Sequence, residues 1–420
     1  MLKNIASLAI KFFGASVSYF LTLYLSKVFG NEKLGYFSFL LSFSLIFLLV
    51  LKLGTDIYMM KWTSKFYSTG EPGKAKYLYF KLLSYHCLAG FVLTSIAIGI
   101  TPFLIRTYFT NYTDYIYFQI GLAGVFFMNL HILNYEFLRG TRRVMSYTFY
   151  HTVSIFLFTV VFNLLLDLLS FNFEFKFVWC YLGAIVISFL VSFFEVISKI
   201  KNEKTVRIET LRINTVISDS IPFFSNNAVF VLIGTIDIFI LSRYIMPASV
   251  GEYALILKIA TFISFPLTVM SANFAPKIPG FSSKSKLIKE IKKNGKIIIV
   301  FASLIYGLIF LLFPSITSFL SLKSDKNLLI YAMIGLGFLI SSLFALNEAC
   351  LLMLGEEKLY QKIMLAACVI NLILNLLLIP VWKELGAAFA SLFTIASWNL
   401  AAAFYTRKKL QLPTGIINKI

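Results

Sequence analysis

Long apolar stretches recur along almost the whole chain, and they constrain its fold more than any other feature. Each needs about 20 residues to cross the hydrocarbon core of a bilayer, about 30 Å thick, as a helix that pairs its own backbone polar groups. Twelve stretches meet this requirement, at residues 5–28, 34–57, 78–104, 115–138, 147–169, 177–198, 217–241, 250–275, 297–319, 328–354, 361–381 and 385–406. We therefore expect an all-α integral membrane protein with twelve transmembrane helices.

The composition excludes an ordinary soluble protein. Of the 420 residues, 59% are hydrophobic and only 14% are charged, whereas soluble domains carry about 25% charged residues. Too few charges remain to cover several soluble domains, so the excess apolar surface must face lipid. The first apolar stretch is too long for a cleavable signal peptide, contains Lys11 and lacks a small-residue cleavage site.

The residue types of metal sites, disulfides and catalytic centres are scattered through the sequence. The cysteines stand singly in apolar stretches, at Cys87, Cys180, Cys350 and Cys368, and the three histidines are far apart. No GxSxG, HExxH or phosphate-binding GxxxxGK[ST] motif is present. We expect no catalytic residues, no metal site and no resident cofactor, and hence a protein that is not an enzyme.

Basic residues predict the orientation in the membrane. Most of the 38 lysines and arginines lie at the chain ends or in every second connector. Cytoplasmic connectors carry this excess, so both termini should be cytoplasmic, and the formal charge of +19 reflects topology rather than nucleic-acid binding. The segment 284–296 (KSKLIKEIKKNGK) is interpreted as one such connector, with a basic helix on anionic lipid as the alternative.

Two short patterns recur in the same order and at nearly the same separation. LSK followed by Gly35 matches LSR followed by Gly251, and Asn163 in FNLLLDLL matches Asn375 in LNLLLIPV. An offset of six helices makes the halves parallel repeats, an architecture found in transporters with a central site. The expected division is an N-terminal lobe at 1–198, a basic cytoplasmic linker at 199–214, a C-terminal lobe at 215–407 and a cytoplasmic tail at 408–420.

Ionisable residues inside the apolar stretches are the candidate functional residues. Each costs at least about 2.5–3.5 kcal/mol at mid-membrane unless it faces a cavity or a partner. These residues are Lys11, Lys52, Asp56, Glu136, Asp237, Lys258 and Glu348. A cavity lined by Lys11, Lys52 and Lys258 would attract an anion. The four carboxylates would serve either coupling to a proton or sodium gradient or a structural role, and Asp56 lies four residues from Lys52, close enough to neutralise it.

Three segments resemble a known family. VFGNEKLGYFSFLLSF…LKLGTDIYMMKW, GTIDIFILSRYIMPASVGEYALILKIATFISFPLTVMSANFAPKI and MLGEEKLYQKIMLAACVINLILNLLLIPVWKELGAAFASLFTIAS are similar to the Wzx-type polysaccharide (O-antigen and capsule) flippases. These belong to the multidrug/oligosaccharidyl-lipid/polysaccharide exporter superfamily. The resemblance implies a MATE-like, two-lobe fold around a partly cationic cavity. It also implies that Lys52 and Lys258 hold the anionic cargo and that Asp237 matches the acidic residue of the seventh helix.

The function that this resemblance implies is flipping of polyprenyl-diphosphate-linked oligosaccharide repeat units to the outer leaflet of the bacterial inner membrane. Membrane lipids, a polysaccharide polymerase and a chain-length regulator are the implied partners. A MATE-type drug or cation antiporter is the first alternative, although embedded lysines do not suit cationic cargo. A membrane polymerase or glycosyltransferase is the second alternative, and the short connectors near 105–114 and 170–176 argue against it.

Overall fold

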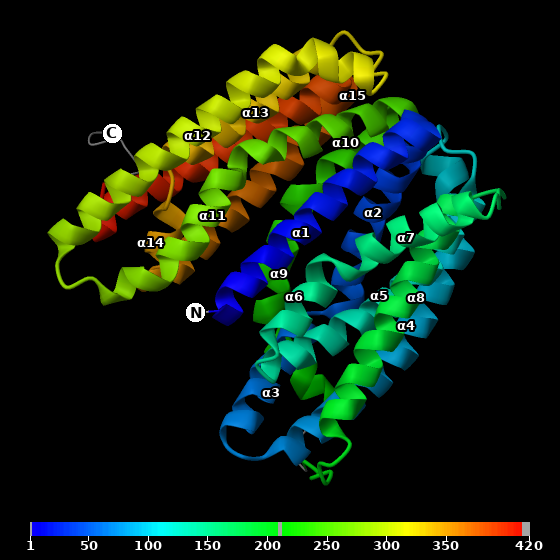
Figure 1. Cartoon of the computed structure of the whole chain (residues 1–420), viewed down its shortest axis with the longest axis vertical. Coiled ribbons are helices and arrows are strands. Elements are labelled where there is room, and N and C mark those ends of the chain that lie inside the picture. The colour runs from blue at the N-terminus through cyan, green and yellow to red at the C-terminus, as the bar shows by residue number, and fades with distance from the viewer. Residues whose placement is uncertain (1, 209–211, 414–420) are drawn as a thin grey trace. The chain divides into compact units, whose positions relative to one another are not determined.

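A computed structural model describes residues 2–208 and 212–413, with side chains from residue 9 onward (Figure 1). All regular elements in these residues are helical. In chain order they are α1 (Leu2–Tyr24), η1 (Leu25–Phe29), α2 (Gly30–Lys52), α3 (Thr55–Ser68), α4 (Pro72–Tyr108), α5 (Tyr115–Gly140), α6 (Val144–Thr152), α7 (Ser154–Leu168), α8 (Lys176–Ile200), α9 (Ile213–Tyr244), α10 (Pro247–Thr261), η2 (Phe262–Ser264), α11 (Phe265–Phe274), η3 (Ala275–Gly280), α12 (Lys284–Phe319), α13 (Asn327–Leu343), α14 (Asn347–Met353), α15 (Glu357–Tyr405) and η4 (Thr406–Leu410). The predicted linker 199–214 and tail 408–420 lie partly outside the described residues.

The described helices are long and apolar enough for many membrane crossings. Eight segments qualify singly, and two pairs bent by 51° and 48° qualify when each pair is taken as one span. Two of the eight, Ala9–Lys52 and Glu357–Leu410, contain 44 and 54 residues, and each is long enough to cross twice at a rise of about 1.5 Å per residue. The chain is therefore an all-helical, multi-pass membrane protein, and its helix lengths accommodate the expected twelve crossings.

The helix α15 contains a reversal of the chain. Lys383 has non-helical backbone angles, with φ 50° and ψ −125°. The side chain of Asn371 donates a hydrogen bond to Thr394 Oγ1 over 3.1 Å, although a straight helix would separate these residues by about 35 Å. Residues before and after Lys383 therefore form two antiparallel helices, which agrees with the predicted spans 361–381 and 385–406.

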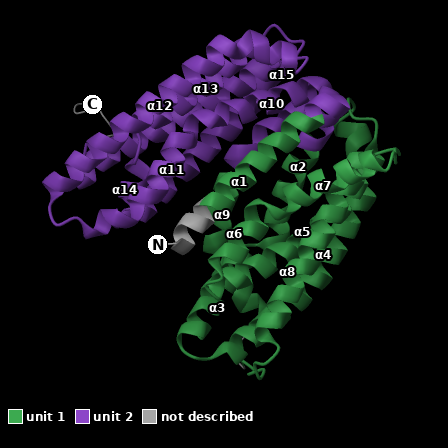
Figure 2. Cartoon of the chain, viewed as in Figure 1, with its two compact units in different colours: residues 1–25, 39–231 green, residues 26–38, 232–420 purple. Residues whose placement is uncertain are grey.

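The chain divides into two compact units (Figure 2). Unit 1 comprises Met1–Leu25 and Phe39–Val231, and unit 2 comprises Ser26–Ser38 and Leu232–Ile420. The boundary between the units falls within α2 and within α9, so each of these helices has one part in unit 1 and the other in unit 2. Residues 26–38 and 215–231 thus group differently from the lobes expected from the repeat, whose limits remain a sequence-based prediction.

In unit 1, helix α5 lies among α3, α4 and α8, and α1 packs against α6 and α7. Buried aromatic and aliphatic residues such as Tyr79, Phe137 and Val196 form a core between these helices. Gly14 brings α1 close to α6, because a Cβ there would stand 2.6 Å from the carbonyl oxygen of Thr152. This contact fixes the first helix beside the bend that separates α6 from α7.

In unit 2, helices α2 and α10 make a reciprocal close contact through Gly35 and Gly251. A Cβ on Gly35 would lie 1.8 Å from the carbonyl oxygen of Pro247, and a Cβ on Gly251 would lie 2.0 Å from that of Asn31. Gly35 thus contacts the residue four positions before Gly251, and Gly251 contacts the residue four positions before Gly35. The contact therefore brings together two positions, Gly35 and Gly251, that match in the sequence pattern.

The basic segment 284–296 is helical and forms the beginning of α12. The segment is amphipathic: Leu287 and Ile291 are buried in the core of unit 2, while most of the lysines are exposed. Its apolar residues, spaced four apart, give it a helical face to pack. Its assignment as a cytoplasmic connector between two membrane spans stays a sequence-based prediction.

Candidate functional site

A cavity of about 330 Å³ lies inside unit 1, at the bend between α6 and α7. Its walls come from α2, α5, α6, α7, α8 and α9. The apolar lining includes Leu45, Leu48, Met128, Ile132 and Phe156, and the polar lining includes Lys52, Tyr135, Tyr150, His151 and Asn227. Non-helical backbone at membrane depth is tolerated where it is buried in protein or lines a hydrated cavity. This cavity is therefore the first candidate site.

Lys52 reaches this cavity as part of an ion pair. Its Nζ lies 2.8 Å from Asp56 Oδ2, and the two side chains are 12% and 7% exposed. Helix α2 ends at Lys52 and α3 begins at Thr55, because Leu53 and Gly54 between them have positive φ. Gly54 also lets α9 approach, because a Cβ would stand 2.5 Å from the carbonyl oxygen of Ser220. The structure thus joins two of the predicted residues as a neutralising pair.

A buried polar chain continues from this ion pair into unit 1. Thr55 Oγ1 donates to the carbonyl oxygen of Lys52 over 2.6 Å and lies 2.8 Å from His86 Nε2. The other ring nitrogen of His86 lies 3.0 Å from Asn129 Oδ1. Sequence analysis missed this chain, because its members are 31 and 43 residues apart and share no linear pattern.

Glu136 and Lys11 complete the charged groups near the cavity. Glu136 is buried and pairs with Arg139, 3.3 Å away on the same helix. Lys11 is exposed on α1 and, like Lys52, interacts electrostatically with His151 of the cavity wall. Among the described residues no carboxylate forms an ion pair with Lys11. The carboxylates Asp56 and Glu136 are thus matched by cations, and Lys11 is a surplus positive charge.

The remaining predicted residues lie in unit 2, at separate places. Asp237 is 3% exposed and accepts hydrogen bonds from Tyr253 Oη over 2.8 Å and from the backbone N–H of Ile238 over 2.7 Å. Lys258 is half-buried on α10, one turn before the 3-10 helix η2. The hydrogen bond of Asp237 joins α9 to α10, which is a structural role whether or not the carboxylate also couples to an ion.

Glu348 lines a second cavity, of about 290 Å³, where α13 and α14 meet at an angle of 48°. Tyr360, Trp398 and Asn399 of α15 form part of the same lining. No group of three or more His, Cys, Asp or Glu residues that could hold a metal ion occurs in the part of the chain that the structure describes.

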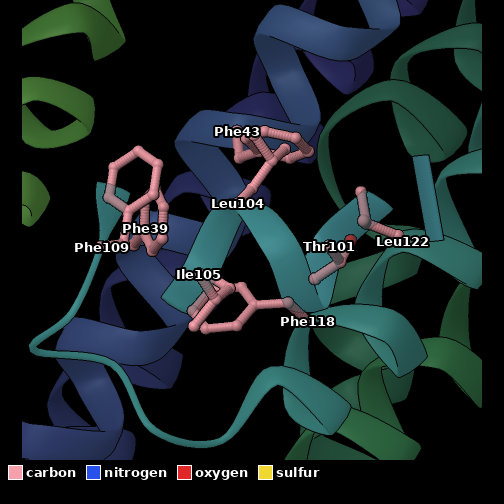
Figure 3. Close-up of a pocket in the computed structure, with 8 residues that line it drawn as sticks. All are labelled: Phe39, Phe43, Thr101, Leu104, Ile105, Phe109, Phe118 and Leu122. Atoms are coloured by element: carbon pink, nitrogen blue, oxygen red, sulfur yellow. The ribbon is translucent and has the colours of Figure 1, made fainter. Parts of the chain in front are cut away.

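A third cavity, shown in Figure 3, is a packing void rather than a site. It measures about 20 Å³, and its walls are the aromatic and aliphatic residues of α2, α4 and α5 around Phe39. Its single polar lining residue, Thr101, already donates to the carbonyl oxygen of Ala97 over 2.7 Å. A water molecule needs two or more polar partners, so this void stays apolar.

The whole chain is similar to solved transporter structures. Lipid II flippase MurJ in an inward closed conformation matches with a TM-score of 0.75 and 16% identity over 96% of this chain and 87% of that chain. An inward-facing multidrug resistance MATE family transporter of the MOP superfamily matches at 0.71 and 12% over 97% and 98%. A MOP superfamily transporter from Pyrococcus furiosus matches at 0.64 and 13% over 97% and 95%.

Sequence comparison adds nothing to this likeness, since neither a family model nor a curated protein matches the chain. At such low identity the likeness establishes the architecture and leaves the cargo open. The chain therefore has the fold shared by the MurJ flippase and the MATE transporters, as its sequence predicts.

Proposed function

We propose that the protein flips polyprenyl-diphosphate-linked oligosaccharides from the cytoplasmic to the outer leaflet of a bacterial inner membrane. The observation that carries this proposal is the charge balance beside the unit 1 cavity. Asp56 and Glu136 are each matched by a cation, and Lys11 adds a positive charge on the side of His151. Lys11 is exposed and has no carboxylate partner among the described residues, so an anionic group of the cargo, such as a diphosphate, can pair with it.

The cavity also suits a cargo that is partly apolar. Aliphatic residues such as Leu45, Leu48 and Ile132 line one part of it, while Lys52, His151 and Asn227 line another. A sugar that crossed hydrocarbon unaided would leave its hydroxyl groups without hydrogen-bond partners, at a cost of several kcal/mol each. Polar cavities between the helices would replace those partners while the lipid tail stays in the bilayer. Alternating access of two repeats then moves the head group across.

The direction of transport requires an energy source or removal of the product. In this proposal a proton or sodium gradient acts through an embedded carboxylate, with Asp56 and Asp237 as the candidates. Alternatively, a polysaccharide polymerase and its chain-length regulator consume the flipped lipid on the outer face. The positive-inside pattern orients both termini toward the cytoplasm.

A drug or organic-cation antiporter is the second candidate, because solved MATE structures have this fold and one observation favours it. The unit 2 cavity places the carboxylate of Glu348 in one lining with Trp398, and aromatic rings with a carboxylate attract organic cations. The surplus lysine in unit 1 argues the other way.

Gene deletion tests the proposal directly. We expect loss of surface polysaccharide on gels and immunoblots, with lipid-linked oligosaccharide accumulating on the cytoplasmic face. Complementation with wild type restores the polymer, and Lys11→Gln restores it poorly. Lys326→Gln, which removes an exposed charge at the start of α13, is the control and should complement fully. Normal polysaccharide together with new sensitivity to cationic dyes would reject the flippase and establish the antiporter.

A further inference from the structure

The unit 2 cavity lies where the backbone departs from helical geometry. Leu346, between α13 and α14, has φ 71° although it is not glycine. A residue held in this region costs about 1–3 kcal/mol and persists only where its surroundings enforce it. The cavity lining includes Leu346 itself and residues from α11, α13, α14 and α15. The break therefore opens a space inside the unit.

The side chains in this space offer mainly hydrogen-bond acceptors. Asn347 Nδ2 donates to the carbonyl oxygen of Phe344 over 2.7 Å, and Asn399 Nδ2 donates to that of Ile395 over 2.8 Å. One N–H of each amide is thus engaged within the protein, while the second N–H can still donate and the two Oδ1 atoms keep their capacity to accept. The Glu348 carboxylate lies in the same lining as Tyr360 and offers further acceptor positions.

Aromatic surface accompanies these acceptors. Trp398, Tyr360 and Phe344 belong to the lining, together with the hydroxyl groups of Ser271 and Ser341. An aromatic face beside several acceptors matches a sugar ring, which presents C–H bonds on its faces and donor hydroxyls at its edge. The volume of about 290 Å³ is at the lower end for small-molecule sites, about 300–1,000 Å³, and suits a single sugar unit.

An organic cation fits this cavity less well. The lining has a single carboxylate, that of Glu348. On its other side Trp398 lines a neighbouring groove that also contains Lys362, whose positive charge repels a cation. The cavity therefore favours a ligand with neutral hydrogen-bond donors over a positively charged ligand.

We propose that the cavity around Trp398, Glu348 and Asn399 is a recognition site for one sugar residue of the cargo. The ring stacks on Trp398, and its hydroxyl groups donate to Glu348 and Asn399. This inference rests on the proposed flippase function and names the part of the chain that would distinguish glycosylated cargo from bare lipid.

The test uses the full-length protein in vesicles with two lipids. One is the lipid-linked oligosaccharide extracted from the deletion strain, and the other is polyprenyl diphosphate without sugar. We expect Trp398→Ala and Asn399→Ala to raise the KM for the glycosylated lipid roughly tenfold, the effect of about 1.4 kcal/mol. The KM for the bare lipid should not change. Trp398→Phe should recover much of the loss. Trp382→Ala, at the end of the preceding helical segment of α15 and 52% exposed, is the matched control.

Each other outcome overturns a specific statement. An unchanged KM for the glycosylated lipid, or an equal rise for both lipids in folded variants, rejects the sugar site and leaves the flippase standing. Transport of neither lipid by wild type rejects the flippase itself. Binding of tetraphenylphosphonium that Trp398→Ala abolishes, with unchanged transport of the glycosylated lipid, assigns the cavity to organic cations.

Discussion

Replacing Gly35 by alanine should destabilise the protein through one contact. Gly35 in α2 lies against the backbone of α10, and an added Cβ would stand 1.8 Å from the carbonyl oxygen of Pro247. An ordinary contact needs at least 3.4 Å, so the methyl group would stand at about half that distance. Because the obstructing atom is backbone, no rotamer change relieves the overlap. The two helices must separate.

The size of the effect follows from two opposing terms. Forcing one extra methyl group into a packed contact costs about 1–3 kcal/mol, and more where backbone must move. Alanine in place of glycine gains about 0.5–1 kcal/mol in a helix interior. We expect a net loss of about 1–2 kcal/mol or more for Gly35→Ala. Gly251→Ala should cost a similar amount, since its Cβ meets Asn31 at 2.0 Å.

Thermal unfolding in detergent, followed with a thiol-reactive dye, measures this loss. Cys180 and Cys350 are buried and react when the helices separate. Gly234→Ala is the control, because nothing lies within 4 Å of its Cβ, and it should melt at or above the wild-type temperature. The double variant at positions 35 and 251 should lose less than the sum of the single losses, since both act on one contact. Wild-type melting of Gly35→Ala would refute the reciprocal contact.

Three further predictions concern buried polar groups. Asp56→Asn leaves Lys52 without its partner and should destabilise the fold by about 3–5 kcal/mol, while adding Lys52→Gln should restore much of this loss in the same melting assay. Glu252→Gln weakens the anchor of the connector before α13, where the carboxylate accepts from Lys323 N over 2.9 Å, and should raise protease cleavage there without changing the helix content seen by circular dichroism. Tyr253→Phe removes the hydroxyl that donates to Asp237 and should lower the free energy of unfolding by about 1.5–3 kcal/mol. If the bond to the charged carboxylate causes this loss, the same substitution should have no effect in an Asp237→Asn background.

The membrane spans could be predicted from the sequence because their signal is local. A run of about 20 apolar residues has few alternatives to a membrane helix. The turn within α15 is a good example: Pro380, Lys383 and Gly386 interrupt an apolar run, and the structure reverses the chain there. The matched glycines Gly35 and Gly251 were likewise visible as a repeat, although their mutual contact was not.

The candidate sites were less predictable because they depend on contacts between distant residues. Sequence alone placed Lys52 beside Asp56, which are four residues apart. It could not connect His86 with Asn129 and Thr55, since only the packing of α3, α4 and α5 brings them together. Nor does the sequence predict the break at Leu346, because leucine strongly prefers negative φ and this residue has a positive φ.

Departures from local preference occur beside both polar cavities. Leu53 with positive φ adjoins Lys52 in unit 1, and Leu346 lines the cavity in unit 2. A chain that needed only to span the membrane would avoid such breaks, because each one costs free energy and frees backbone groups in a solvent that cannot satisfy them. The breaks persist where ionisable side chains lie beside them, Lys52 in one unit and Glu348 in the other. Local rules thus fail beside these two cavities, and the proposed passage of a polar cargo would explain why the chain accepts that cost there.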